Sequence, residues 1–137
     1  MKKRIFVLSL ILIMLLSTSM ICAAEHEEVE PLYIGTTSAI INLNISNGDA
    51  TMTANLIPVS DSVFDRVNIT IELYKGNTSV YKGSFNTYYD DIAGKFKKTV
   101  TEELDSKGSY YAKATFKCYK SGTLIETINK SSGYVVY

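Results

Sequence analysis

Strict alternation of apolar and polar side chains between residues 109 and 120 is the feature that most limits how this chain can fold. Apolar side chains occupy every second position there, at Tyr110, Ala112, Ala114, Phe116 and Cys118. Successive side chains of a β-strand point to opposite faces, whereas a helix would scatter these five around its circumference. The segment therefore predicts a strand with one buried face, and this register places Cys118 inside.

The same period of two recurs along the chain, and no stretch sustains the 3.6-residue period of a helix. Gly, Asn, Asp and Ser clusters separate the periodic segments, as turn residues do. We predict strands at about 36–46, 50–57, 65–75, 78–87, 95–104 and 109–120, and a last strand from 123 toward the C-terminus, bent near 131–133. The other side chains expected to point inward are Ile41, Leu43, Ile45, Ala50, Met52, Ala54, Leu56, Val67, Ile69, Ile71, Leu73, Phe96 and Val100.

Residues 105–112 (DSKGSYYA) resemble the Asp-x-x-Gly-x-Tyr-x-Cys run of immunoglobulin-like domains. The resemblance implies that Tyr110 is the corner tyrosine, whose hydroxyl bonds back to nearby backbone. Ala112 stands where such domains have a disulfide cysteine, and no Trp is present to pack in the core. We expect an all-β fold, a single immunoglobulin-like antiparallel β-sandwich of about seven strands. A small antiparallel barrel or meander of the same strands is the alternative.

The first 24 residues form a different unit. A basic start (2–4) precedes an apolar run (5–16), and small residues (22–24) end it. This is the order of a secretory signal peptide cut after Ala24, so we expect a secreted, extracellular protein, with association to the cell surface as a variant of that location. The alternatives are an uncleaved anchor, since the leader is about long enough to span a bilayer, and a lipoprotein modified at Cys22.

Removal of the leader changes the composition. The leader holds three of the 14 Lys and Arg and none of the 14 Asp and Glu, so the mature chain (25–137) has a net charge of −3. Nucleic acid and anionic lipid are poor partners for it, because both need clustered cations. Contact with a membrane is expected only through the leader, if it is not cleaved. Residues 25–33 (EHEEVEPLY) form an acidic flexible tail, 34–137 form the sandwich domain, and Cys118 has no cysteine left to pair with.

The chain has no histidine placed to act as the general base of nucleophilic catalysis. The one histidine, His26, lies in the acidic tail, whereas Ser–His and Cys–His sites need that group beside the nucleophile. The loop aspartates match no spacing of a cation-binding loop. We therefore expect a protein that is not an enzyme and holds no cofactor and no metal. The carboxylates that a glycosidase would have to use are Asp61, Asp65, Asp90, Asp91, Glu102, Glu103 and Asp105, all in loops or at strand ends.

The candidate for function is an outward face. In an immunoglobulin-like arrangement, the strands at 65–75 and 109–120 lie in one sheet. Their outward side chains place tyrosines beside adaptable polar groups, by which binding surfaces gain contact area at modest entropic cost. An ordinary solvated face, with Glu72 paired to Lys113 or Lys117, is the alternative. The candidate binding residues are Glu72, Tyr74, Tyr111, Lys113, Lys117 and Tyr119, with the loop residues Tyr88 and Tyr89 as an extension.

The mature chain also resembles a family of small secreted β-sandwich proteins of Gram-positive bacteria whose function is not characterised. The resemblance lies in the signal peptide, the start at 31–33 (PLY), the hairpin at 120–123 (KSGT) and the finish at 134–137 (YVVY). It implies an extracellular domain of no known activity and transfers no site residues. We expect a monomeric interaction domain that binds a protein or another cell-surface component. A glycan or cell-wall binding module and a small bacteriocin-like effector are the alternatives.

Overall fold

The computed structural model describes residues 32–137. The signal peptide, its cleavage site and most of the acidic tail lie outside the described residues, so the expectations about them stay predictions. No helix between residues 32 and 137 is long and apolar enough to cross a membrane.

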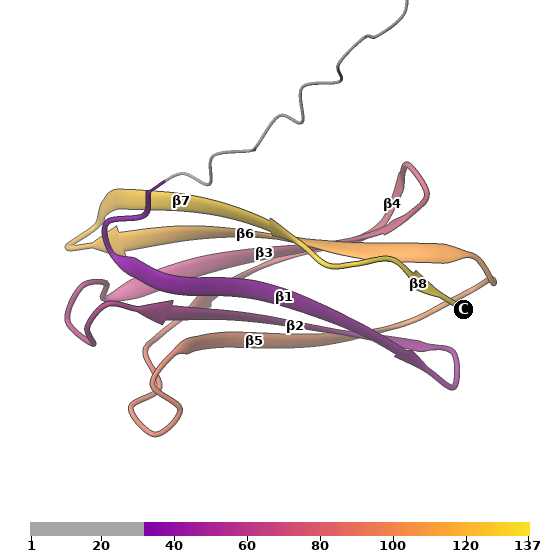
Figure 1. Cartoon of the computed structure of the whole chain (residues 1–137), viewed down its shortest axis with the longest axis horizontal. Coiled ribbons are helices and arrows are strands. Elements are labelled where there is room, and N and C mark those ends of the chain that lie inside the picture. The colour runs from indigo at the N-terminus through magenta and orange to yellow at the C-terminus, as the bar shows by residue number, and fades with distance from the viewer. Residues whose placement is uncertain (1–31) are drawn as a thin grey trace, which may run out of the picture. The chain divides into compact units, whose positions relative to one another are not determined.

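Two antiparallel sheets form the part of the chain that the structure describes (Figure 1). The three-stranded sheet contains, in spatial order, β1 (Thr36–Ser46), β2 (Asp49–Pro58) and β5 (Phe96–Glu103). The five-stranded sheet contains, in spatial order, β4 (Thr78–Thr87), β3 (Arg66–Lys75), β6 (Ser109–Lys120) and β7 (Thr123–Ser131), with the short β8 (Val135–Val136) paired to the start of β6. The prediction of an all-β antiparallel sandwich is confirmed.

The observed strands lie close to the predicted ranges. The predicted pairing of the strands at 65–75 and 109–120 is also confirmed, because β3 and β6 are hydrogen-bonded neighbours. The last strand differs from the prediction, since it is broken between β7 and β8 rather than bent. Ser132 explains the break, because its Oγ accepts the hydrogen bond from the Ala112 amide at 2.8 Å and so replaces a backbone carbonyl.

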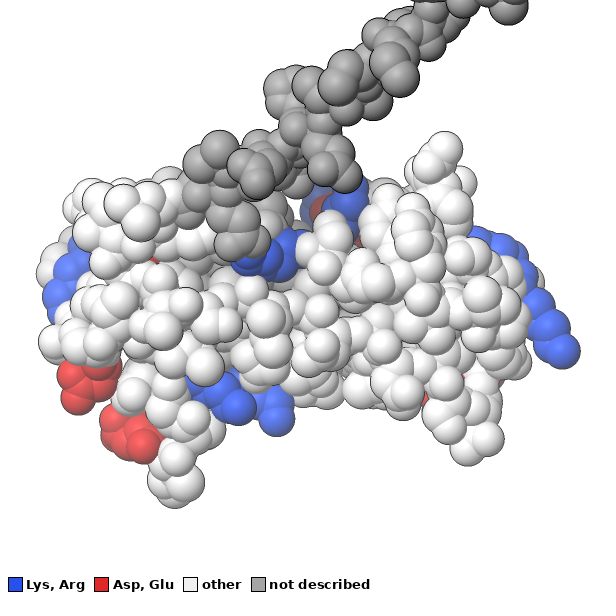
Figure 2. Space-filling view, viewed as in Figure 1, with Lys and Arg blue, Asp and Glu red and all other residues white. Residues whose placement is uncertain are grey.

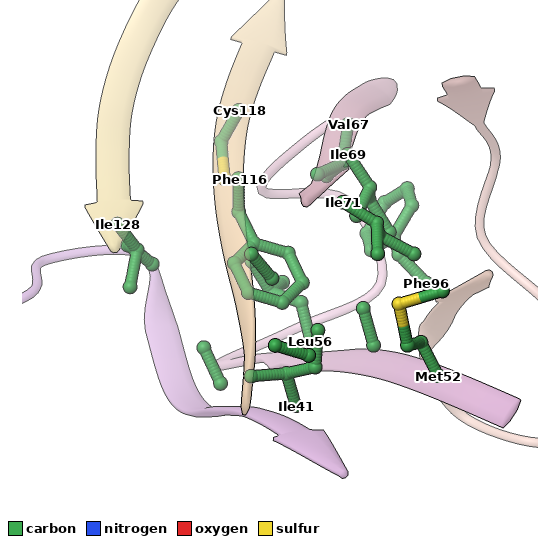
Figure 3. Close-up of a cluster of buried hydrophobic side chains, with 14 of the residues drawn as sticks. Ile41, Met52, Leu56, Val67, Ile69, Ile71, Phe96, Phe116, Cys118 and Ile128 are labelled. Atoms are coloured by element: carbon green, nitrogen blue, oxygen red, sulfur yellow. The ribbon is translucent and has the colours of Figure 1, made fainter. Parts of the chain in front are cut away.

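The core lies between the sheets and is filled by alternate residues of β2, β3 and β6, with Phe96 from β5 and Ile128 from β7 (Figure 3). All predicted inward residues of β2, β3 and β6 are buried, including Cys118. Leu43, Ile45 and Val100 pack against this core but are only partly buried. Their strands, β1 and β5, are the edges of the three-stranded sheet, and an edge strand has solvent along one side.

Two side-chain contacts hold the margins of the sandwich. The Tyr110 hydroxyl donates a hydrogen bond to the Ser106 carbonyl, which confirms the corner tyrosine. At the opposite margin, the carboxylate of Glu126 in β7 accepts hydrogen bonds from the Ile34 amide at 2.8 Å and from the Thr36 hydroxyl at 2.7 Å. This second contact ties the start of β1 to the other sheet, and the sequence pattern did not point to it.

Candidate binding face

The backbone register brings six of the predicted site residues onto one surface. On β3 and β6, Tyr74 stands opposite Tyr111, and Glu72 stands opposite Lys113. Toward the other end of the pair, Tyr119 stands opposite Arg66. We call this surface the tyrosine face and define it as the outward residues of β3 and β6 with two neighbours, Lys82 and Tyr134. Its members are Arg66, Asn68, Thr70, Glu72, Tyr74, Tyr111, Lys113, Thr115, Lys117, Tyr119, Lys82 and Tyr134.

Three tyrosine rings form a contiguous cluster at one end of the tyrosine face. The rings of Tyr74 and Tyr111 stack with centroids 5.1 Å apart and an angle of 13° between their planes. Tyr134, which is 71% exposed, tilts against Tyr111 with centroids 5.0 Å apart. Sequence reasoning missed Tyr134 as a site residue. Only the break between β7 and β8 brings it over β6, and strand periodicity does not reveal that break.

Lys113 adds a positive charge to this cluster. Its Nζ lies 4.9 Å from the ring centroid of Tyr74 and 5.5 Å from that of Tyr111. An ammonium over an aromatic face is attracted by the ring quadrupole. The ring faces supply no lone-pair acceptor, so the N–H donors of Lys113 remain available for an acceptor from outside.

Glu72 stands opposite Lys113, as one alternative predicted, but it forms no ion pair with Lys113 or Lys117. Glu72 forms its ion pair with Lys82, on the other side of β3, at 2.8 Å between Nζ and Oε1. The hydrogen bond to Glu72, and then its charge, raise the pKa of Lys82 above the usual value. Lys82 is 65% exposed, so solvent screens the pair and its effect on stability is small. The pair does neutralise the one carboxylate of the face.

Polar side chains fill the middle and far end of the tyrosine face. The Arg66 guanidinium lies 4.2 Å from the centroid of the Tyr119 ring and donates to Asn86 Oδ1 at 3.0 Å. Asn68 donates to the same oxygen at 3.1 Å. Arg66 is therefore held in one orientation, whereas Lys117 extends from an exposed position between the two ends and forms no ion pair with any residue from 32 to 137.

A shallow hollow of about 370 Å³ opens beside the tyrosine cluster. Its lining comes from three strands, with Tyr74 on β3, Lys113 on β6 and Asn129 on β7 among its walls. Asn129 Oδ1 accepts a hydrogen bond from Thr115 at 2.8 Å, which leaves its amide NH₂ as a donor. The hollow therefore offers donors next to aromatic carbon.

Within residues 32–137, neither Tyr88 nor Tyr89 has a ring contact with the tyrosine face. Both belong to the segment between β4 and β5, which crosses from one sheet to the other. Tyr89 packs its ring on Phe96 with centroids 5.6 Å apart and so belongs to the margin of the core. Tyr88 is exposed, and no contact joins it to the tyrosine cluster within residues 32–137.

The outer face of the three-stranded sheet has a different chemistry. Its threonines pair across β2 and β5, Thr51 with Thr101 at 3.3 Å and Thr53 with Thr99 at 3.2 Å between hydroxyl oxygens. No aromatic residue stands among the outward residues of β1, β2 and β5. Figure 2 views the domain from the side where β1 and β7 lie, and uncharged atoms cover most of the surface it shows. The exposed aromatic cluster therefore lies on the outer face of the five-stranded sheet and not on that of the three-stranded sheet.

Metal-ligand side chains and the one thiol of residues 32–137 remain to be placed. Between residues 32 and 137, no three His, Cys, Asp or Glu side chains are placed to hold a metal ion together. Cys118 is buried, and this burial, with a smaller contribution from Glu126, raises the pKa of its thiol to about 12. At neutral pH it is a protonated thiol packed among apolar side chains, as its place in β6 predicted.

No family model and no curated protein matches the chain. The tyrosine face and the leader are therefore the features that bear on function.

Proposed function

We propose that this protein is a non-catalytic interaction domain, secreted or held at the cell surface, that binds a partner protein through the tyrosine face. The leader supports the location. A single folded domain acting as a monomer is the simplest form of the proposal.

The observation that supports it is the cluster of Tyr74, Tyr111 and Tyr134. None of the three rings is part of the buried core, and Tyr134 projects into solvent from the segment between β7 and β8. Tyrosine and arginine are enriched at the energetic centres of protein interfaces, because they bury large area and still form hydrogen bonds. Two tyrosines stacked on each other also lose little side-chain entropy when a partner covers them.

The geometry favours a protein partner over a glycan. Sugar-binding sites present an open aromatic face, whereas Tyr74 and Tyr111 each turn one face to the other ring. Lys113 lies over both rings as well. What these two residues present to solvent is largely ring edge, hydroxyl and ammonium, which suits the mixed polar and apolar surface of a protein.

The test is capture of a partner from the cell envelope and culture supernatant of the source organism, with the Tyr74→Ala/Tyr111→Ala double variant compared with wild type. Loss of two residues at an energetic centre removes about 2 kcal/mol or more, which is about thirtyfold in affinity. Circular dichroism checks that the variant folds, as expected for residues outside the core.

The matched control is Thr53→Ala/Thr99→Ala, which removes a cross-strand pair from the outer face of the other sheet. Capture by this control should equal that of wild type. Treating the extract with protease before capture should abolish the signal, while treating it with a glycan-degrading enzyme should not. Equal capture by wild type and Tyr74→Ala/Tyr111→Ala would remove the support for the proposal.

A further inference from the structure

We infer that the tyrosine face recognises an acidic segment of the partner protein, one in which apolar or aromatic side chains lie between the carboxylates. The inference depends on the proposed function and adds the chemistry of the partner to it. It follows from the distribution of charge between the two outer faces, from the donors around Lys113, and from the spacing of cations and rings.

The two outer faces carry opposite charge. On the five-stranded sheet, the outward residues include four cations, Arg66, Lys82, Lys113 and Lys117, and one carboxylate, Glu72. On the three-stranded sheet, one cation faces outward against two carboxylates, at Lys97, Asp49 and Glu103. The tyrosine face is therefore net positive by three charges, and the opposite face is net negative by one.

Two of the four cations are available to a partner. Glu72 pairs with Lys82, and Arg66 is engaged with Asn86 and Tyr119. Lys113 contacts ring faces, and the exposed Lys117, four residues further along β6, forms no ion pair with any residue from 32 to 137. Both point to the same side of the strand, about 13 Å apart along it. Two carboxylates four residues apart on an extended peptide would match this spacing.

The hollow beside Lys113 suits one such carboxylate. The Lys113 ammonium and the Asn129 amide both line it, and Thr115 lies between them. The one carboxylate in its lining, Glu72, is paired with Lys82. A carboxylate placed there would accept charge-assisted hydrogen bonds, which are shorter and stronger than neutral ones. The Tyr74 ring forms the adjoining wall and would contact an apolar side chain next to the carboxylate.

A phosphate polymer fits this surface less well than a peptide. Nucleic acids and other polyphosphates are held by runs of Lys and Arg that follow the backbone charge, with Arg favoured for its bidentate geometry. Here the one arginine is already oriented by two neighbours, and three uncharged rings occupy the end of the face next to Lys113. A chain without apolar groups would leave those rings uncovered.

The experiment measures binding of the purified protein to four probes by calorimetry or interferometry. The probes are a random copolymer of Glu and Tyr, poly-Glu, polyphosphate and poly-Lys. We expect the copolymer to bind most tightly, poly-Glu more weakly, and poly-Lys not at all. Binding of the copolymer should weaken steeply as ionic strength rises from about 0.05 M to about 0.5 M, because salt screens exposed charges.

The decisive variant is Lys113→Glu/Lys117→Glu, which should lower copolymer affinity at least about tenfold. Lys97→Glu, on the opposite face, is the matched control and should leave the affinity unchanged. Circular dichroism and a urea melt check that both variants fold. Undiminished binding by the double variant, tighter binding of polyphosphate than of the copolymer, or no binding of the copolymer would each overturn the inference.

The same variants separate this inference from the proposed function. If Tyr74→Ala/Tyr111→Ala loses the captured partner while Lys113→Glu/Lys117→Glu retains it, the tyrosine face binds a protein that is not recognised by its acidity. If both double variants retain the partner, the proposed function fails together with the inference.

Discussion

Tyr110 and Cys118 stand on the same face of β6, and the fold uses their polar atoms in different ways. The Tyr110 ring is buried, but its hydroxyl reaches the Ser106 carbonyl at the margin of the sandwich and is satisfied there. The Cys118 sulfur lies deep in the core, where desolvation disfavours the thiolate. Tyr110 therefore links β6 to the turn before it by a hydrogen bond, whereas Cys118 serves as a small apolar residue of the core.

The shifted pKa of Cys118 predicts weaker folding at alkaline pH. Below pH 9 the thiol is protonated in both the folded and the unfolded chain, so its contribution is constant. Between the ordinary value of 9.0 and the folded value of about 12, the unfolded chain loses the proton and the folded chain keeps it. The free energy of unfolding should then fall by up to about 1.4 kcal/mol per pH unit from this group.

Urea unfolding of wild type and Cys118→Val between pH 8 and pH 11 measures this contribution. The other ionisable groups are common to both proteins and cancel in the difference, so the stability of wild type should decline more steeply than that of the variant. Parallel pH profiles, or rapid labelling of native Cys118 by a thiol reagent at pH 8, would show that the thiol is not buried in this way.

Two hairpins have both of their central residues in the left-handed region of backbone conformation. Asn47 and Gly48, between β1 and β2, have φ of 55° and 91°, and Ser121 and Gly122, between β6 and β7, have φ of 49° and 81°. Positive φ at both central residues is the pattern of a type I′ turn, whose twist matches that of paired strands. Asn tolerates this region better than Ser does, so the second hairpin is the less favourable of the two.

Ser121→Asn should therefore stabilise the fold by about 0.5 kcal/mol. The backbone bond from residue 121 to Asp65 Oδ2 would remain, because the amide donates it. The urea midpoint at constant slope measures the change. Ser109→Asn, at a β-strand position without positive φ, is the control and should bring no gain; an equal shift in both variants would rule out the turn as the cause.

At the scale of the whole domain, packing between the sheets supplies the stability. The described residues contain one cysteine, and it is free. Phe96, from the edge strand β5, reaches between the sheets and contacts the rings of Phe64 and Tyr89 at 6.5 and 5.6 Å between centroids. Without covalent cross-links, a domain of this size has a few kcal/mol to spare, so one large cavity weighs heavily on it.

Phe96→Ala should lower the free energy of unfolding by about 3 to 5 kcal/mol, because it removes a fully buried ring. The matched control is Phe85→Ala on the edge strand β4. Phe85 is half-buried, with the Lys98 ammonium 4.2 Å from its ring centroid, so its loss should be clearly smaller. Urea unfolding compares the two, and equal losses would place the packing centre elsewhere.

Strand positions, turns and inward faces were predictable because they depend on local chemistry. Side chains alternate along a strand whatever its neighbours are, so Ile69 and Phe116 could be assigned to the core from periodicity alone. The corner tyrosine was predictable for a similar reason, since its hydroxyl bonds only four residues back along the chain. The same alternation assigned Tyr74 and Lys113 to the outward side.

The sequence by itself thus determined the strands, their faces and the class of fold, whereas the tertiary structure decided which outward residues meet. Net charge did not predict a cationic face, because composition sums over both sheets. The Tyr134 contact and the Glu126 tie depend on strand order and on the break after β7. They join residues that are distant in the chain, and hydrophobic periodicity holds no information about which strands become neighbours. The Glu72–Lys82 pair lies across one hairpin, where the register shift between Leu73 and Tyr74 decides which residues stand opposite each other.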